Sequence, residues 1–373
     1  MTQTTAAMHA RDLISVPLRA GPRRSPQEGR TRVLRKWRRM KAMVLHRPEP
    51  ASASPLHAAD LPVPAPGAGE IVLRVRRCGV CHTDLHITAG ELPVHKTPLV
   101  PGHQVVGIVE SIGAGVTAFA AGARVGVTWL YDSCGRCDAC AGGRENLCVD
   151  ARFTGYDVDG GYAQFMTARA DYAHPIPERF SDTDAAPLLC AGVIGYRALR
   201  LSEVQPGQRL GLFGFGTSAH LVIQVARYWG CQVYVFTRSE AHREHARALG
   251  AVWAGGAEQR APAAVHAAIV FAPSGGVVVQ ALGHLERGGT VVVNAIHLDG
   301  IPAFDYDLLY WERTLRSVSN VTRRDAQEFL ALADAIPVRA SVTVFPLLQA
   351  NAALAALRTG ALSGAAVLDL EAA

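Results

Sequence analysis

Four cysteines clustered in a short stretch constrain the fold of this chain more than any other feature. They follow the spacing Cys-x2-Cys-x2-Cys-x7-Cys, at Cys134, Cys137, Cys140 and Cys148. Four thiolates complete the tetrahedral shell of a zinc ion and leave no open position, so this spacing predicts a closed site that stabilises a loop. The first three cysteines also match ferredoxin spacing, but the prolines and the second cysteine set of a ferredoxin are absent around them.

A second set of candidate zinc ligands is spread over a much longer stretch. Cys81 opens the run Cys-His-Thr-Asp-Leu-His, His103 ends a Pro-Gly-His turn, and Cys190 lies in an apolar run. Two thiolates and an imidazole would leave the fourth position of a zinc ion open to water or substrate. Taken alone, however, His103 is more typical of a hydrogen-bonded loop histidine, and Cys190 of a core residue.

The residues that follow Cys81 favour the catalytic interpretation. Thr83 offers a hydroxyl that can take a proton from a zinc-bound alcohol, and His86 can pass that proton to solvent. Asp84 can accept the second ring N–H of His103 and so fix its tautomer. A zinc ion would lower the pKa of a bound alcohol, and the alkoxide then expels hydride readily.

A glycine-rich loop between a strand and a helix predicts the hydride acceptor. The motif Gly-x-Gly-x-x-Ala follows a strand expected over residues 208–213 and opens a helix expected over residues 217–229. Glycines at such a turn admit the pyrophosphate of a dinucleotide to the helix N-terminus. The residues assigned to this loop are Gly211, Gly214, Gly216, Thr217 and Ala219.

The end of the next expected strand, over residues 232–236, bears on the choice of dinucleotide. NAD-binding sites usually place an acid there for the ribose 2′-hydroxyl, but Thr237 and Arg238 occupy these positions. Because a guanidinium can receive a 2′-phosphate, we expect NADP to be accepted and slightly preferred over NAD. The alternative is that Arg238 is a solvated loop residue.

Length and composition indicate a globular protein of two domains. The chain has 373 residues, of which 49% are apolar and 18% charged, as in ordinary soluble domains, and no apolar run is long enough to span a membrane. The formal charge of +5 is concentrated in residues 1–39, where ten Arg and Lys against two acids give +8 and leave −3 for the remainder. That mildly acidic remainder offers no basic face for nucleic acid.

Residues 1–40 are predicted to form a disordered basic extension, because they are Arg-rich, acid-poor and interrupted by prolines. They lack the apolar segment of a secretory signal. A transit peptide is one alternative, and a segment upstream of a natural start at Met40 or Met43 is another. Eight cysteines without a secretory signal favour metal ligation over disulfides, and therefore a reducing cytoplasm.

Two patterns succeed each other along the rest of the chain. Residues 41–180 hold short strand-like runs that glycines and prolines interrupt, which is typical of an irregular β-barrel. From about residue 185, strands and helices alternate, which indicates a parallel sheet. The runs expected to be strands include 41–45, 71–75, 105–110, 124–127, 265–271 and 290–294, the last introduced by Gly288 and Gly289. A helix at 325–335 and strands at 341–345 and 366–370, flanking a helix at 347–357, are expected near the C-terminus.

With these motifs the chain resembles the zinc-dependent medium-chain alcohol dehydrogenases, on the side of the yeast-type and bacterial enzymes. The resemblance covers about residue 41 to the C-terminus. It is carried by Cys-Gly-Val-Cys-His-Thr-Asp-Leu-His at 78–86, Pro-Gly-His at 101–103, Trp-Leu at 129–130, Asp-Gly-Gly-Tyr-Ala at 159–163 and Leu-Cys-Ala-Gly at 189–192.

The resemblance implies an α/β fold in which a GroES-like β-barrel catalytic domain is joined to a Rossmann domain with a doubly wound parallel sheet. The catalytic domain would comprise residues 41–192 and 322–373, and the NAD(P)-binding domain, inserted between them, residues 193–321. The implied activity is reversible hydride transfer between a small alcohol and NAD(P), with an aldehyde or ketone as the product. A homodimer or homotetramer is implied as well, with no nucleic-acid or membrane partner.

Site roles follow from the resemblance position by position. Cys81, His103 and Cys190 would hold a catalytic zinc, and the four clustered cysteines a structural zinc, which makes two ions per chain. Thr83 and His86 resemble the proton relay of the family, which runs through the cofactor ribose. The remaining implied contacts are His82 with cofactor phosphate, Trp129, Leu130 and Tyr131 with the alcohol, and Arg323 or Arg324 with the pyrophosphate.

One departure from the family stands beside the predicted catalytic zinc. Where the family usually has Gly-His-Glu, this chain has Gln104 after His103, which makes the site more positive by about one charge. We expect the pKa of a bound alcohol to fall further as a result. Two alternatives to the leading interpretation remain at this point: a cinnamyl- or polyol-type dehydrogenase of the same superfamily, and a non-catalytic zinc-lobed protein that binds nucleic acid through the basic extension.

Overall fold

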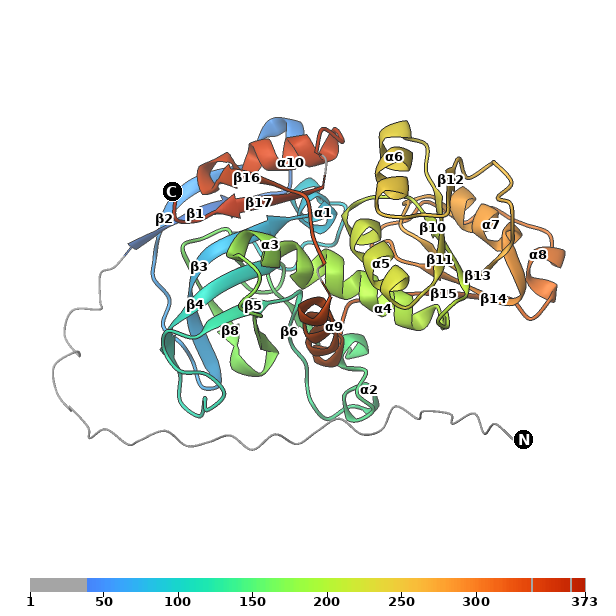
Figure 1. Ribbon diagram of the computed structural model, residues 1–373. Coiled ribbons are helices and arrows are strands. Elements are labelled where there is room, and N and C mark those ends of the chain that lie inside the picture. Colours follow the sequence, from blue (N-terminus) through green and yellow to red (C-terminus); the bar gives the residue numbers. More distant parts are fainter. Residues whose placement is uncertain (1–38, 337, 363, 373) are drawn as a thin grey trace, which may run out of the picture. The chain divides into compact units, whose positions relative to one another are not determined.

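The strands of the described part of the chain form two large sheets and two strand pairs. The structure, a computed structural model, describes residues 39–336, 338–362 and 364–372 (Figure 1). The predicted basic extension therefore lies outside the described residues, apart from Arg39 and Met40. These two residues begin strand β1 (Arg39–Leu45), two positions earlier than expected, because they pair with Pro62 and Leu61 of β2 (Leu56–Pro62).

The first large sheet is mixed and has strand order β16-β17-β3-β4-β5-β9, with β8 also paired to β3. The runs predicted at 71–75, 105–110 and 124–127 lie in β3, β4 and β5. The strands are β3 (Glu70–Val80), β4 (Gln104–Ile112), β5 (Arg124–Val127), β8 (Phe165–Arg169), β9 (Ala173–Pro175), β16 (Val342–Pro346) and β17 (Ala365–Asp369). The small pair β6 (Leu130–Asp132) and β7 (Arg152–Phe153) lies outside this sheet.

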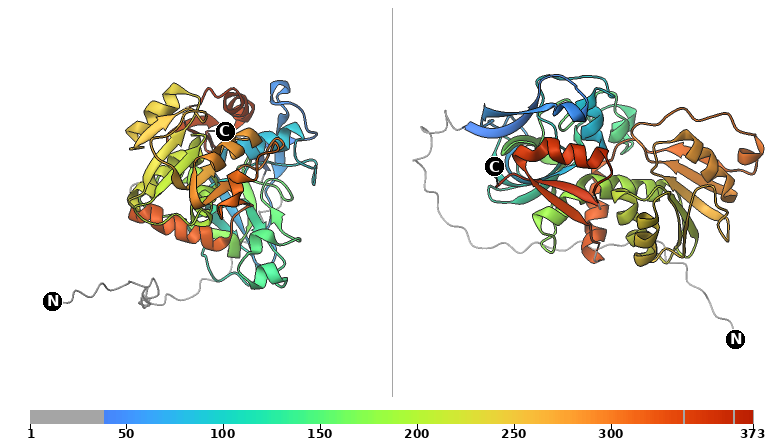
Figure 2. Two further views of the ribbon diagram at one scale, coloured as in Figure 1. Left: turned by 90° about the vertical axis from the view of Figure 1, so that its right-hand side faces the viewer. Right: turned by 90° about the horizontal axis from the view of Figure 1, so that it is seen from above.

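The last strands of the chain complete the sheet that the first strands begin. β17 runs antiparallel to β3 and pairs Leu368 with Cys78, and Figures 1 and 2 show these red strands alongside the blue ones. The chain between β16 and β17 forms a short 3-10 turn and then α10 (Ala350–Arg358). The helix expected from residue 347 therefore begins at Ala350. The domain boundaries at residues 192 and 321 remain a prediction, although this pairing agrees with an inserted second domain.

The second large sheet is entirely parallel, with strand order β12-β11-β10-β13-β14-β15. Its strands are β10 (Arg209–Phe213), β11 (Gln232–Phe236), β12 (Trp253–Gly255), β13 (Val265–Val270), β14 (Leu285–Val293) and β15 (Thr314–Ser317). From β10 the chain winds first toward β12 and then toward β15. The order therefore reverses between β10 and β13, which is where open α/β sheets bind their ligands.

The helices of this part of the chain are α4 (Val193–Leu201), α5 (Thr217–Tyr228), α6 (Glu240–Ala248), α7 (Gly275–Gly283), α8 (Asp307–Tyr310) and α9 (Arg323–Ala335). Four of them, α5 to α8, lie between strands of the parallel sheet in the chain, while α4 precedes its first strand and α9 follows its last. Leu221, Val222, Val225 and Ala226 of α5 are fully buried, as their helical spacing predicts. No helix within the described ranges is both long enough and apolar enough to span a membrane.

One expectation about this sheet was wrong in detail. Gly288 and Gly289 do not precede a strand but lie inside β14, which begins at Leu285. The register with β13 shifts between the pairs Val265–Leu285 and Ala267–Thr290, and Gly288 has a φ of 75° there. Glycines inside a strand mark such an irregularity as well as a strand end, so the sequence pattern alone did not separate the two.

Candidate active site and metal centres

The three predicted ligands of the second zinc site meet although their positions in the chain are far apart. Cys81 follows β3 and is the N-cap of α1 (His82–Ala89), while His103 directly precedes β4. Cys190 lies in a π-helical turn, Leu188–Gly192, between α3 (Asp182–Pro187) and α4. Their ligand atoms all lie within 4.8 Å of one another. We call Cys81, His103 and Cys190 the open site.

The turn before His103 depends on a glycine. Gly102 has a φ of 98°, a conformation that side chains disfavour. A Cβ atom at this position would also approach the Tyr162 ring to 2.4 Å. Since Tyr162 is fully buried, it has no room to move aside. The close packing of these two residues therefore fixes the direction in which His103 leaves the turn.

Asp84 supports two of the three open-site ligands from behind. One of its carboxylate oxygens accepts the Cys81 backbone N–H at 3.0 Å, and the other lies 3.6 Å from Nδ1 of His103. Both Asp84 and His103 are buried, and neither Oδ1 nor Nδ1 has a hydrogen-bond partner within the described part of the chain. Nε2 of His103 faces the Cys81 sulfur at 3.4 Å. The imidazole thus presents Nε2 to the site and Nδ1 to the carboxylate, as metal-bound histidines do.

The charges of the open site suit a divalent cation. A hydrogen bond from Cys190 lowers the pKa of the Cys81 thiol well below its usual value. Burial alone would lower the pKa of His103, but the Cys81 thiolate and the Asp84 carboxylate outweigh it and raise the pKa to about 10. Without a metal, these groups therefore share protons. A zinc ion displaces such protons, because its ligands are thiolates and neutral imidazole.

The distances agree with the same ion. Zinc–sulfur bonds of about 2.3 Å and zinc–nitrogen bonds of about 2.0 Å at a tetrahedral angle separate the two ligand atoms by about 3.5 Å. The observed separation between Cys81 and His103 is 3.4 Å. Three ligands at this spacing leave a fourth position open, which is the arrangement of catalytic zinc sites.

The four clustered cysteines form a second compact group, which we call the closed site. The ligand atoms of Cys134, Cys137, Cys140 and Cys148 lie within 4.8 Å of one another, and the Cys134 and Cys140 sulfurs are 3.9 Å apart. Tetrahedral zinc–thiolate geometry requires about 3.8 Å. Backbone N–H groups of Arg136 and Cys137 lower the pKa of Cys134 to about 6, which favours the thiolate that zinc requires. Four sulfurs leave no position for a substrate.

The proposed relay residues lie on α1, beside the open site. Thr83 interacts with the Cys81 thiolate, and His86 is one turn further along. Nδ1 of His86 contacts the carboxylate of Glu91 at 2.5 Å, a partner that the sequence did not reveal. The His86 ring also lies 5.5 Å from the ring of His297, which follows β14. His82, the predicted phosphate contact, is exposed at the first turn of α1.

The three residues predicted to line the alcohol pocket, Trp129, Leu130 and Tyr131, lie in two different environments. The Trp129 ring meets the His103 ring edge-on, with 4.8 Å between centroids, and stacks on Phe153 and Tyr156. Leu130 and Tyr131 are buried, and the Tyr131 hydroxyl donates to Glu70 at 2.5 Å. Only Trp129 among the three therefore touches an open-site ligand, and a pocket role for Leu130 and Tyr131 remains a prediction.

The glycine-rich loop has the predicted context. Gly211 lies inside β10, and Gly214 follows the strand with a φ of 90°. A Cβ atom at Gly214 would lie 2.9 Å from the backbone nitrogen of Ala272, directly after β13, so the loop is pressed against the neighbouring strand end. Gly216 is the N-cap of α5, and Thr217 and Ala219 stand in its first turn. The loop thus lies where the strand order reverses.

Two guanidinium groups stand at the end of β11, where a dinucleotide ribose is predicted to bind. Thr237 is buried and donates its backbone N–H to Gly255, whereas Arg238 is exposed. A second guanidinium stands beside them, because Arg243 donates to the carbonyls of both Thr237 and Arg238. Arg243 was not singled out from the sequence, since it belongs to helix α6 rather than to the loop.

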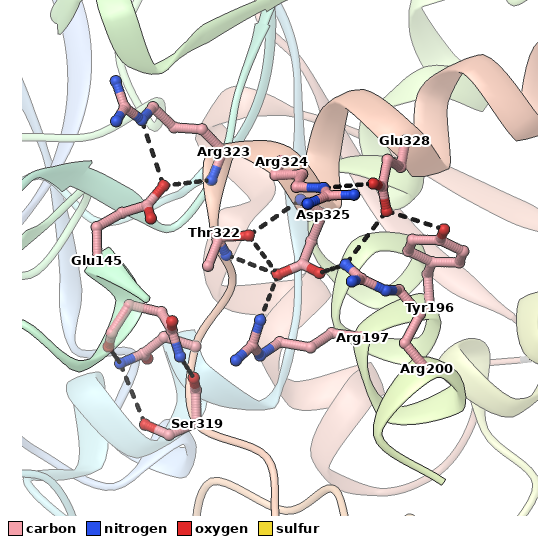
Figure 3. Close-up of polar contacts among 12 residues, drawn as sticks. Glu145, Tyr196, Arg197, Arg200, Ser319, Thr322, Arg323, Arg324, Asp325 and Glu328 are labelled. Atoms are coloured by element: carbon pink, nitrogen blue, oxygen red, sulfur yellow. Dashed lines mark hydrogen bonds and ion pairs between the residues drawn. The ribbon is translucent and has the colours of Figure 1, made fainter. Parts of the chain in front are cut away.

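The two arginines proposed for the pyrophosphate have protein partners in this structure. Arg323 donates to Glu145, which belongs to the closed-site loop, and Arg324 donates to Glu328 (Figure 3). The buried Asp325, next to Arg324, accepts hydrogen bonds from Thr322 and from the guanidinium groups of Arg197 and Arg200. Within the described residues, no hydrogen bond or ion pair joins either arginine to the glycine-rich loop, so their cofactor role remains a prediction.

Gln104 follows His103 in the chain and is the first residue of β4. It is buried, and its side chain covers Gly79, whose Cβ position is only 2.7 Å from the Gln104 side-chain oxygen. Its amide nitrogen has no hydrogen-bond partner within the described ranges. A neutral amide therefore occupies a dry position next to His103, where a carboxylate would add negative charge.

Comparison with known proteins agrees with both halves of this architecture. Residues 67–178 match the family described as alcohol dehydrogenase GroES-like domain, and residues 219–335 match the family described as zinc-binding dehydrogenase. A probable alcohol dehydrogenase, AdhA, from Mycobacterium tuberculosis is 46% identical over 335 residues, covering 88% of this chain and 97% of its own. An alcohol dehydrogenase from a Moraxella species is 38% identical, covering 88% of this chain and 99% of its own.

Solved structures show the same fold. A cinnamyl alcohol dehydrogenase from Sorghum bicolor is 28% identical with a TM-score of 0.81, covering 90% of this chain and 98% of its own. A putative zinc-binding dehydrogenase from Sinorhizobium meliloti, bound to NADP, is 25% identical with a TM-score of 0.78, covering 89% of this chain and all of its own.

The fold and the two metal centres thus define a two-domain, zinc-binding dehydrogenase with a GroES-like catalytic domain and a Rossmann domain. The chain belongs to the zinc-dependent medium-chain alcohol dehydrogenases. It is an oxidoreductase that uses zinc and NAD(P) to interconvert an alcohol and a carbonyl compound.

Proposed function

We propose that the open site is the catalytic centre and that Cys81, His103 and Cys190 hold its zinc ion. The convergence of these three residues from distant parts of the chain carries the proposal. When bound, zinc supplies a Lewis acid that polarises the substrate oxygen. Asp84 keeps the Nε2 atom of His103 free to act as ligand, since the carboxylate can accept the proton on Nδ1.

Thr83 and His86 are proposed to move the alcohol proton. Thr83 is close enough to Cys81 to interact with its sulfur, so its hydroxyl reaches the edge of the open site. His86 lies one helical turn away and is partly exposed, with its Nδ1 atom on Glu91. That contact orients the ring so that Nε2 is available to receive the proton, in the family manner through the cofactor ribose.

The closed site is proposed to hold a second zinc ion with a purely structural role. Its four thiolates would fill the coordination shell and keep the loop from Cys134 to Cys148 folded. The loop is also tied to α9, because Glu145 accepts from the backbone and side chain of Arg323. The structural ion would therefore stabilise a junction between distant segments.

NADP is proposed as the preferred dinucleotide. Thr237 and Arg238 replace the acid that would repel a 2′-phosphate, and the guanidinium of Arg243 stands beside them. The Sinorhizobium relative that binds NADP supports the same choice. Gly214 and Gly216 would admit the pyrophosphate to the N-terminus of α5, with His82 and Arg323 or Arg324 as further phosphate contacts.

The substrate is proposed to be a small alcohol or the matching aldehyde or ketone. Trp129, Phe153 and Tyr156 form an aromatic group beside His103, which favours flat or unsaturated alcohols because their π-systems can stack on aromatic rings. Cinnamyl-type alcohols are therefore included among the substrates to be tested.

Homodimers or homotetramers in the cytoplasm are proposed for the assembled enzyme. β15 is the last strand of the parallel sheet, and the exposed aromatics Tyr306, Tyr310 and Trp311 stand just before it in the chain. An open strand edge next to exposed aromatic rings favours association with a second copy. The absence of disulfides among the described cysteines suits a reducing compartment.

A spectrophotometric substrate panel tests the proposal. Ethanol, benzyl alcohol, cinnamyl alcohol and a polyol are each assayed with NAD and with NADP, before and after treatment with a chelator. We expect alcohol-dependent reduction of the dinucleotide, a higher kcat/KM with NADP, and loss of activity on chelation. Activity that survives complete removal of metal would exclude the open site as the catalytic centre, and a large preference for NAD would exclude the cofactor assignment.

A further inference from the structure

The indole of Trp129 is held by a residue from a distant part of the chain. Its ring N–H donates to the side-chain oxygen of Asn320 at 3.0 Å. Trp129 directly precedes β6 and touches His103, whereas Asn320 lies in the segment between β15 and α9. The indole is only 9% exposed, so this hydrogen bond satisfies a polar group that water reaches poorly.

Asn320 has an unusual backbone conformation for a residue with a side chain. Its φ is 52°, in the left-handed region, which it shares with only three other non-glycine residues in the described part of the chain. Asparagine tolerates this region better than most residues, but strained positions of this kind concentrate at functional sites. The conformation turns the Asn320 amide toward the indole.

The other half of the Asn320 amide is bonded as well. Its nitrogen donates to the Asn146 carbonyl at 3.2 Å and to the Ser319 hydroxyl at 3.3 Å. Asn146, which is buried in the closed-site loop, donates in return to the Ser319 carbonyl at 2.7 Å. These contacts fix which end of the Asn320 amide faces the indole. In the flipped orientation the amide N–H groups would face the indole N–H, so that two hydrogen-bond donors would oppose each other.

We propose that Asn320 is a positioning residue for the alcohol pocket, an assignment that rests on the proposed function. It holds the Trp129 ring against His103 and joins that ring to the closed-site loop through Asn146. The aromatic wall, formed by Trp129 together with Phe153 and Tyr156, is thereby held in a fixed place beside the open site. Substrates that reach the wall depend on Asn320, and substrates too short to reach it do not.

A double-mutant cycle tests whether Asn320 acts through the indole. Asn320→Gly keeps the left-handed backbone accessible but removes the amide, and Trp129→Phe keeps a flat ring but removes the N–H donor. Loss of one buried hydrogen bond predicts a fall of about fivefold in kcat/KM for benzyl alcohol in Asn320→Gly. For ethanol we expect a change of less than about twofold. In the Trp129→Phe background, Asn320→Gly should have little further effect.

Two further variants separate this role from a general loss of structure. Asn320→Asp keeps an oxygen that accepts the indole N–H but loses the donation to the Asn146 carbonyl. Its ratio of benzyl alcohol to ethanol kcat/KM should therefore lie closer to that of the unaltered protein than the ratio of Asn320→Gly does. Glu312→Gly is the matched control, because Glu312 has a φ of 55° but lies in the loop before β15; its ratio should be unchanged.

Three results would overturn the assignment. These are an equal loss of kcat/KM for both alcohols in Asn320→Gly, no loss for either alcohol in Asn320→Gly, and the same loss in the Trp129→Phe background as in the unaltered protein. Failure of the proposed function is distinguishable, because the unaltered protein would then show no zinc-dependent oxidation of either alcohol.

Discussion

The closed and the open site use the same ligand chemistry but are built in opposite ways. The closed site takes its four cysteines from one loop, and three of them are partly exposed. The open site takes its ligands from the start of α1, the turn before β4 and a π-helical turn, and it rests on a fully buried His103 and Asp84. A local site can form wherever its loop folds, whereas an assembled site exists only once the whole domain has folded. The first can therefore stabilise the protein, and the second depends on that stability.

The largest expected effect is the loss of activity when an open-site ligand is removed. Cys190→Ala should lower kcat/KM by about a thousandfold or more, because several kcal/mol of Lewis-acid stabilisation is lost. The zinc content should fall from two ions to one per chain. Both are measured by steady-state kinetics and metal analysis. Cys231→Ala is the control, since Cys231 is buried in the other domain and belongs to neither site. Full activity in Cys190→Ala would contradict the assignment of the catalytic role to the open site.

Removal of a closed-site ligand should act on stability instead. Cys137→Ala is expected to lower the free energy of unfolding by about 3 kcal/mol, because the metal that folds the loop is lost. The midpoint of thermal unfolding measures this effect. The surviving folded protein should retain the open-site zinc ion and lose less than about tenfold in kcat for ethanol. A variant with normal stability but no activity would reverse the roles that we assign.

A change behind the open site should have an intermediate effect. Asp84→Asn removes the charge that faces Nδ1 of His103, and such outer-shell changes typically lower metal affinity or activity by about 10- to 100-fold. Metal affinity is measured by competition with a chelator. Asp138→Asn provides the control at the closed site, because Asp138 is exposed on the loop. Equal effects of the two variants would show that Asp84 is no more than a capping residue.

The smallest predicted effect concerns Gln104. Gln104→Glu restores a negative charge next to His103 and should shift the pH–rate profile of alcohol oxidation to higher pH, because a more negative site holds the alcohol proton more tightly. We expect kcat to change by less than about tenfold. A profile identical to that of the unaltered protein would show that the amide at position 104 is neutral in effect.

The sequence predicted the closed site more directly than the open one, for a physical reason. The spacing of Cys134, Cys137, Cys140 and Cys148 encodes a complete ligand shell within one loop. His103 and Cys190 carry no such local signal, and their assignment depended on the residues that follow Cys81 and on a family resemblance. The strands of the parallel sheet were predictable from their apolar runs and intervening helices, as β11 and β13 illustrate.

Contacts between distant segments could not be foreseen in the same way. The pairing of Arg323 with Glu145, of Tyr162 with Gly102, and of Trp129 with Asn320 depends on the folded arrangement. A single sequence gives each of these residues an ordinary local environment. Each side chain could contact many different residues, and only the folded structure determines which of these contacts forms.

The π-helical turn that carries Cys190 has a consequence for the length of the chain. It interrupts an otherwise continuous helical segment from Asp182 to Leu201, and a π turn contains one residue more than an α turn. Deleting a single residue before Cys190 would restore a regular helix and rotate the sulfur by about 100°. Every ligand type would still be present in the sequence, yet the Cys190 sulfur would point elsewhere. The geometry of the metal centre thus depends on the number of residues in this turn as much as on the amino acids that it contains.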